Sequence, residues 1–119
     1  MVRRTLLAVL ISGLALQSAS AICNVTGPRY TLNSDTVEWT LSIVSGQSCA
    51  QGLRLRTTAV DSVTVTEMAQ HGQVLVRGSG FEFRADANYR GDDFFELTVS
   101  GLNVRVPGTS TIQVQVYIR

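Results

Sequence analysis

The sequence contains no lysine, a single histidine, two cysteines and two prolines. The lone histidine, His71, leaves too few ligands for a zinc site, and no Cys-x-x-Cys spacing supplies the rest. A Ser-His-Asp triad would also need His71, and no Gly-x-Ser-x-Gly turn accompanies it. Helical periodicity is absent after residue 21. These absences favour a protein that is not an enzyme and that carries no cofactor.

The chain also lacks a basic field. All ten positive side chains are arginines, and two of them, Arg3 and Arg4, stand at the start of the chain. Without that pair, eight arginines face nine carboxylates, so the remaining net charge is near −1. A balance of this kind gives no reason to expect binding to nucleic acid.

Residues 1–21 have the three parts of a secretory signal peptide. A basic start at Arg3-Arg4 precedes an apolar run over residues 6–16, and small residues ending in Ala19-x-Ala21 supply a cleavage site. The apolar run is too short to cross a hydrocarbon core of about 30 Å, so we expect cleavage and no stable membrane span afterwards. The sequence thus predicts one exported domain, residues 22–119, in the periplasm or outside the cell.

Both cysteines follow the predicted cleavage site. Two cysteines in an exported chain most simply form one disulfide, here Cys23–Cys49. Closing a loop of about 27 residues stabilises a fold by about 3 kcal/mol in the chain-entropy picture. Free thiols or a shared metal ion are the alternatives.

Apolar and polar residues alternate along most of the domain, as expected for half-buried strands. Gly78-Ser79 suits a two-residue hairpin loop. Trp39 alternates with Val37 and Leu41, so we expect it at the centre of the core, near the disulfide. The sequence predicts an all-β, immunoglobulin-like antiparallel β-sandwich of about seven to eight strands. The expected strands lie near residues 30–32, 37–43, 53–56, 63–66, 74–77, 81–84, 95–99 and 112–118.

A Gly-x-Asp-x-Phe sequence precedes one of the longest predicted strands. Gly91 suits a tight turn that requires positive φ, and Asp93 can accept hydrogen bonds from turn amides. Phe95 would enter the core, with Tyr89 bracing the turn. We therefore predict a structural corner made of Tyr89, Gly91, Asp93 and Phe95.

From Val63 to Ile118, about half of the predicted domain, the chain resembles the cadherin-like or immunoglobulin-like modules of bacterial surface proteins. The resemblance implies a sandwich fold and a role in adhesion and display. It rests on His71-Gly72-x-Val74, Phe81-x-Phe83, Tyr89-x-Gly91-x-Asp93-x-Phe95-x-Leu97-x-Val99 and Gly108-x-Ser110-x-Ile112-x-Val114-x-Val116.

Oxygen-bearing side chains gather around the same corner. Asp86, Asn88, Asp92 and Asp93 form a candidate calcium site, because hard cations prefer clustered oxygens. Solvated turn carboxylates are the simpler interpretation, so no metal is expected. Arg90-Gly91-Asp92 spells an integrin-recognition tripeptide, which we interpret as a coincidence within the corner.

Four arginines on predicted strands could form cross-strand pairs with glutamates, or else a face for an acidic glycan. Pairing is the favoured interpretation, because the domain is not basic overall. The arginines are Arg54, Arg56, Arg77 and Arg84, and the glutamates are Glu38, Glu82 and Glu96.

The sequence favours a small non-enzymatic binding or adhesion module for an unidentified protein or glycan. One alternative is a structural subunit of a surface assembly, in which Thr111–Ile118 pairs as an edge strand with a partner. A calcium-binding module is the other. Oligomeric state stays open.

Overall fold

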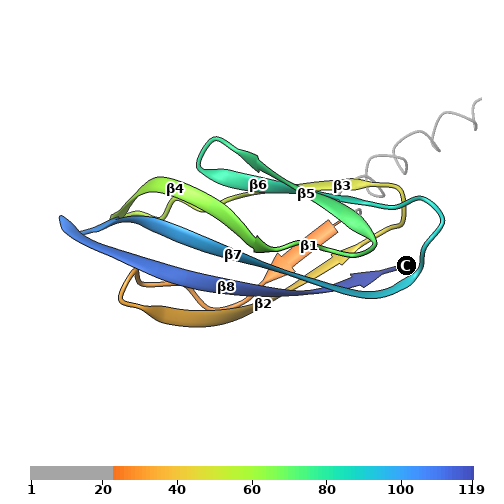
Figure 1. Ribbon diagram of the computed structural model, residues 1–119, viewed down its shortest axis with the longest axis horizontal. Helices are drawn as coiled ribbons and strands as arrows, with labels where there is room; N and C mark the ends of the chain where they lie inside the picture. The colour runs from red at the N-terminus through yellow and green to blue at the C-terminus, as the bar shows by residue number, and fades with distance from the viewer. Residues whose placement is uncertain (1–22) are drawn as a thin grey trace, which may run out of the picture.

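The computed structural model describes residues 23–119, and the predicted signal peptide, residues 1–21, lies outside them. The described chain forms two β-sheets packed face to face (Figure 1). No helix within it is long and apolar enough to cross a membrane. The strands are β1 (Cys23–Thr26), β2 (Asp35–Ile43), β3 (Ser48–Gly52), β4 (Thr58–Glu67), β5 (Gly72–Arg77), β6 (Gly80–Ala85), β7 (Gly91–Asn103) and β8 (Val106–Ile118).

The larger sheet has the order β1-β2-β8-β7-β4. β7 and β8 form a long antiparallel hairpin whose register runs from Gly91 opposite Ile118 to Asn103 opposite Val106. On its other side β8 pairs in parallel with β2, from Asp35 opposite Ser110 onward. The all-β prediction is confirmed, but this sheet is not wholly antiparallel. Nearly the whole domain connects β2 to β8, so no tight turn dictates their relative direction.

β8 is therefore an inner strand, hydrogen-bonded on both sides. The prediction that Thr111–Ile118 forms an open edge is wrong, because both rows of its backbone groups are already paired. The open edge opposite β1 is β4, whose register is broken between Val60 and Ser62 and again between Val65 and Glu67. Such irregularities twist an edge away from a partner strand.

The smaller sheet has the order β3-β6-β5. The Gly78-Ser79 hairpin is confirmed, because Arg77 pairs with Gly80 around this two-residue turn. Gly78 has φ of 58°, a conformation that glycine adopts without a side-chain clash. Arg77 of β5 forms a salt bridge with Glu82 of β6, so one predicted cross-strand pair is confirmed. Arg84 also bonds Glu82, but along the same strand, and within residues 23–119 no arginine forms a salt bridge with Glu38 or Glu96.

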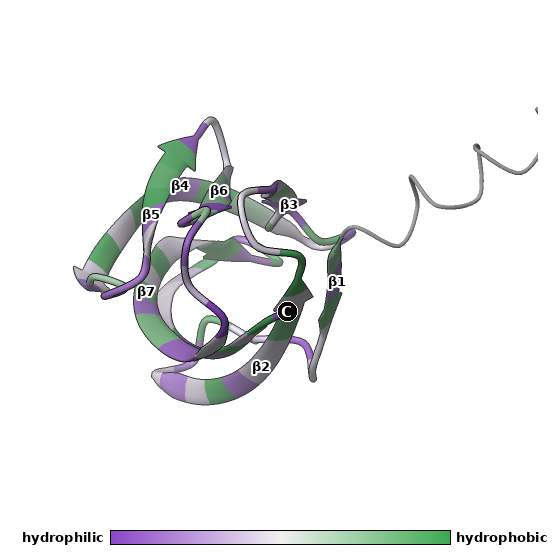
Figure 2. Cartoon of the chain, turned by 90° about the vertical axis from the view of Figure 1, so that its right-hand side faces the viewer, coloured by the Kyte–Doolittle hydropathy of each residue, from purple (hydrophilic) through white to green (hydrophobic). Residues whose placement is uncertain are grey.

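The core lies between the two sheets and contains three phenylalanine rings. Phe83 stacks on Phe95 with ring centroids 5.6 Å apart, and Phe81 meets Phe95 edge-on at 5.5 Å. Hydrophobic and hydrophilic bands alternate along β2, β4 and β7 (Figure 2). From Asp93 to Gly101 in β7 and from Ser110 to Ile118 in β8, every second residue is buried, as the period of two requires.

Two predicted strands are loops. Residues 53–56 and 30–32 alternate in polarity, yet neither segment is a strand. Tyr30 and Leu53 are both buried, and the Tyr30 hydroxyl donates to the Leu53 carbonyl oxygen. Leu32 has φ of 58°, which interrupts any extended run. Both loops close the core from the side, so their alternation reflects loop burial and not strand pairing.

The predicted disulfide is confirmed. Cys23 in β1 and Cys49 in β3 are bonded with their Cα atoms 5.8 Å apart, so the bond joins one sheet to the other. Trp39 is not at the centre of the core, contrary to the prediction. It is half-buried at the margin, where its indole N–H donates to the Pro28 carbonyl oxygen at 2.7 Å. Its ring leans over Gly27, where an added Cβ would lie 2.2 Å from Trp39 Cδ1.

Candidate binding face

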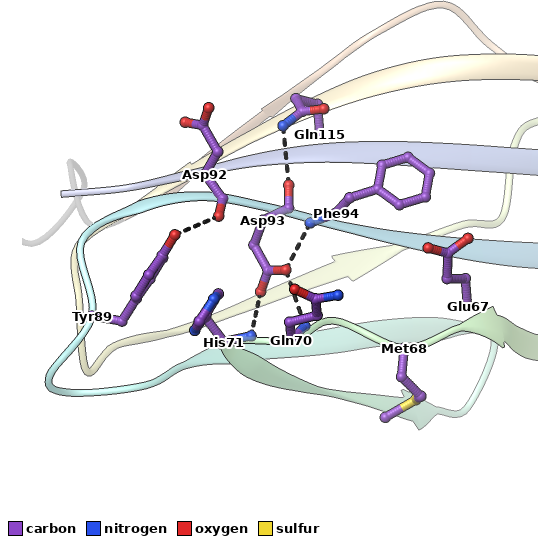
Figure 3. A pocket seen from close by; sticks show the side chains of 9 residues that line it. All are labelled: Glu67, Met68, Gln70, His71, Tyr89, Asp92, Asp93, Phe94 and Gln115. Atoms are coloured by element: carbon purple, nitrogen blue, oxygen red, sulfur yellow. Dashed lines mark hydrogen bonds between the residues drawn. The ribbon is translucent and has the colours of Figure 1, made fainter.

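The predicted corner is built around Asp93, which is 7% exposed. Its Oδ1 accepts hydrogen bonds from the backbone amides of Gln70, at 3.0 Å, and Phe94, at 2.8 Å. Its Oδ2 accepts one from the amide of His71, at 2.7 Å (Figure 3). The carboxylate thereby ties the segment between β4 and β5 to the start of β7.

Tyr89 occupies the outer side of the corner. Its hydroxyl donates to the Asp92 carbonyl oxygen at 2.9 Å, and its ring stacks on the His71 imidazole with centroids 3.6 Å apart. Gly91 has φ of 142°, and an added Cβ would lie 2.8 Å from the Tyr89 hydroxyl. Phe95 is fully buried. The four predicted corner residues thus meet, while the stacked His71 was not foreseen.

The candidate calcium residues do not converge. Both oxygens of Asp93 accept backbone amides, and Asp92 projects to the opposite side of β7 (Figure 3). Asp86 and Asn88 are exposed in the loop between β6 and β7. Across residues 23–119, no three His, Cys, Asp or Glu side chains are grouped closely enough to hold a metal ion. Arg90 and Asp92 are both exposed beside Gly91.

The solvent side of the larger sheet carries an ordered array of polar and aromatic side chains. β8 contributes Gln113, Gln115 and Tyr117, which alternate with buried residues. Sheet register sets their neighbours on β2 and β7, because directly opposed residues on one face lie side by side. Three rows result: Glu38, Gln113 and Glu96; Thr40, Gln115 and Phe94; Ser42, Tyr117 and Asp92.

Two hollows open on this face and share Phe94 and Gln115. One, of about 350 Å³, extends across β8 toward Tyr117 and Glu38. The other, of about 320 Å³, extends past the edge of β7 toward His71 and Tyr89. The two hollows are neighbours, because Phe94 and Gln115 line both of them, and we refer to them together as the groove. We call the side chains of this groove and its rows the binding face.

Acceptor groups dominate the binding face. Glu96 accepts hydrogen bonds from the Thr66 hydroxyl at 2.8 Å and from Nε2 of Gln113 at 3.1 Å. Nε2 of Gln115 donates to the Asp93 carbonyl oxygen at 3.1 Å. Within residues 23–119, no hydrogen bond from a protein donor to the Oε1 atom of either glutamine is found. The carboxylates of the face are Glu38, Glu67, Asp92 and Glu96, together with the buried Asp93, which lines one hollow.

Reasoning from sequence predicted arginine partners for Glu38 and Glu96 and an edge-pairing role for Thr111–Ile118, and it did not predict a binding groove on this face. Period-two alternation identifies which residues face out, but the neighbours across strands depend on register. The parallel register of β2 and β8 brings Thr40 beside Gln115, and the antiparallel register of β7 and β8 brings Phe94 to the other side of Gln115.

No known family model matches the chain, and no curated protein matches it. The resemblance of Val63–Ile118 to cadherin-like or immunoglobulin-like modules therefore stays a prediction. What the structure provides is an all-β, two-sheet sandwich with one disulfide and a grooved polar face.

Proposed function

We propose that this protein is an exported, non-enzymatic binding module and that the binding face takes a neutral glycan. The observation that carries the proposal is the groove in which Phe94, Gln115 and Tyr117 lie together on one rigid sheet. Side chains on paired strands are held in place before a ligand arrives, which lowers the entropic cost of binding.

The chemistry of the groove suits a sugar. Aromatic rings such as Phe94 and Tyr117 offer flat apolar surfaces against which the C–H faces of a pyranose can pack. Amide and carboxylate oxygens accept hydrogen bonds from hydroxyls, and a glutamine amide also donates. The surrounding carboxylates would repel an acidic glycan, since like charges across an interface weaken binding. A neutral, hydroxyl-rich ligand satisfies all three conditions.

Export is the second part of the proposal. It is supported by the signal-peptide pattern of residues 1–21 and by the Cys23–Cys49 disulfide, because disulfides persist in oxidising compartments. Polysaccharides of the cell surface and its surroundings would be accessible to a module in that location.

The test is a glycan array followed by titration calorimetry with any neutral glycan that binds. We expect Phe94→Ala and Gln115→Ala each to weaken binding by about tenfold or more, as for central contact residues. Thr98→Ala is the matched control, since Thr98 faces out from β7 beyond both hollows. Absence of binding to every neutral glycan, or equal losses in all three variants, would overturn the proposal.

A further inference from the structure

The turn between β7 and β8 exposes apolar side chains at one extremity of the molecule. Leu102, Val104 and Val106 are 37%, 68% and 63% exposed, and they flank or form the turn. The turn lies at the opposite end of the long axis from the C-terminus (Figure 1). We call the segment 102–106 the hairpin tip.

The backbone of the hairpin tip is unusual for its sequence. Val104 and Arg105 form a two-residue loop with φ of 47° and 69°. Loops with two positive φ values favour Asn-Gly, and a β-branched residue there is an outlier. Folding gains little from Val104, whose side chain is mostly in solvent. An exposed valine held in a costly conformation points to a role outside folding.

Three arginines belong to the hairpin tip or to a loop that contacts it. Arg105 belongs to it, while Arg54 and Arg56 lie in the loop between β3 and β4. That loop is attached to the tip, because Thr57 accepts the Val104 amide at 3.0 Å and donates to Asn103 at 3.1 Å.

All three guanidinium groups are exposed, and within residues 23–119 none of them takes part in a salt bridge. The prediction that Arg54 and Arg56 join Arg77 and Arg84 on one sheet face is wrong, because residues 53–56 form a loop. The acidic side chains of the binding face lie on β2, on β7 and at the far end of β4, where Glu67 is the last residue.

Two carboxylates lie in the same region: Asp61 follows Val60, which pairs with Gly101, and Asp35 accepts the amide of Thr31, whose carbonyl oxygen accepts from Asn103. Three arginines against two carboxylates leave this end with a small excess of positive charge.

We propose that the hairpin tip docks on an anionic lipid surface. An apolar apex bordered by arginines matches a membrane interface, in which apolar side chains enter the acyl boundary and guanidinium groups meet phosphates. A two-residue turn is too narrow to supply the roughly 800 Å² per partner typical of a stable protein interface. Its shape and its charge therefore both favour lipid over protein.

The experiment uses the processed, oxidised protein from the periplasm of an expression host. It is sedimented with vesicles made of equal parts phosphatidylglycerol and phosphatidylcholine, or of phosphatidylcholine alone. We expect binding to the anionic vesicles, weakened by high salt. The double variant V104N/R105G installs the favoured turn, so we expect it to lose vesicle binding while its melting temperature stays the same or rises.

A second variant tests charge separately. R54Q/R56Q should weaken binding by roughly 25-fold, about fivefold for each arginine removed near an anionic surface. R90Q/R119Q removes the same charge from the far end and should leave vesicle binding unchanged. Three results would overturn the proposal. They are no vesicle binding, equal binding to both vesicle types, and a lipid-independent dimer that V104N/R105G dissolves, which would assign the tip to a second copy of the chain.

Discussion

Replacing Asp93 with asparagine exchanges one carboxylate oxygen for an NH2 group and leaves the size of the side chain almost the same. In the native corner, Oδ1 and Oδ2 accept three backbone amides from Gln70, His71 and Phe94. An asparagine can keep its oxygen toward Gln70 and Phe94, but its NH2 group then faces the amide of His71. Two donors cannot bond, so one buried N–H loses its acceptor.

The expected loss of stability follows from those contacts. Hydrogen bonds to a charged acceptor contribute about 1.5–3 kcal/mol, against about 1 kcal/mol for neutral ones, and an unsatisfied buried donor costs about 1–3 kcal/mol. Two weakened bonds and one lost bond together give a loss of about 3 kcal/mol for Asp93→Asn. For a domain of this size that corresponds to a fall in melting temperature of roughly 10–25 °C.

Urea unfolding and thermal melting of Asp93→Asn measure this loss, with Asp92→Asn as the control. Asp92 undergoes the same chemical change one residue earlier, but its exposed carboxylate accepts no hydrogen bond from any residue of the described chain. We expect the control to change stability by less than about 0.5 kcal/mol, as for ordinary surface sites. Equal stabilities for the two variants would refute the view that Asp93 anchors the corner.

Three further predictions concern stability. Cys23→Ser combined with Cys49→Ser should lower the free energy of unfolding by about 3 kcal/mol in urea titrations, whereas an unchanged midpoint would show that the disulfide contributes little. Burial alone would raise the pKa of Asp35, but hydrogen bonds from a serine hydroxyl and nearby backbone amides outweigh it and lower the pKa from 3.8 to about 2. The lowered pKa of Asp35 should therefore stabilise the folded state fully above about pH 4, and this contribution should be lost as the pH falls toward 2. After allowance for screening by solvent, it amounts to about 1 kcal/mol. In Asp35→Asn the free energy of unfolding should therefore fall less between about pH 4 and about pH 2 than in the native protein. Equal falls in the two proteins would contradict the role given to Asp35. Gly108→Ala should destabilise by about 2–4 kcal/mol in the same titration, because its Cβ would lie 1.8 Å from the Leu32 carbonyl oxygen, and native stability would show that the loop yields.

Much of the fold could be predicted because apolar and polar residues alternate along a strand that has one buried face. β7 and β8 alternate without a break through their apolar residues, so their existence and inward faces followed from the sequence. β3 could not be found this way, because Ser48–Gly52 is short and consists of small or polar residues around Cys49. The strand predicted near residues 53–56 was wrong because Leu53 is buried although it lies in a loop.

Partners across strands were harder to predict than strands. Alternation says nothing of which strand lies beside which, and the parallel pairing of β2 with β8 joins segments far apart in the chain. The corner could be foreseen because Gly91 and Asp93 act locally, through a turn and its amides. The binding face could not, because Gln115 and Phe94 become neighbours only through register.

The inner position of β8 also dictates when this protein can fold. Its partners β2 and β7 flank it on both sides, so until Val106–Ile118 has emerged the larger sheet is split into two unconnected parts. Pairing Asp35 with Ser110 closes a loop over most of the domain, a high-contact-order step that is slow. A chain threaded across a membrane from its N-terminus would thus stay unfolded during passage and acquire its structure only on arrival.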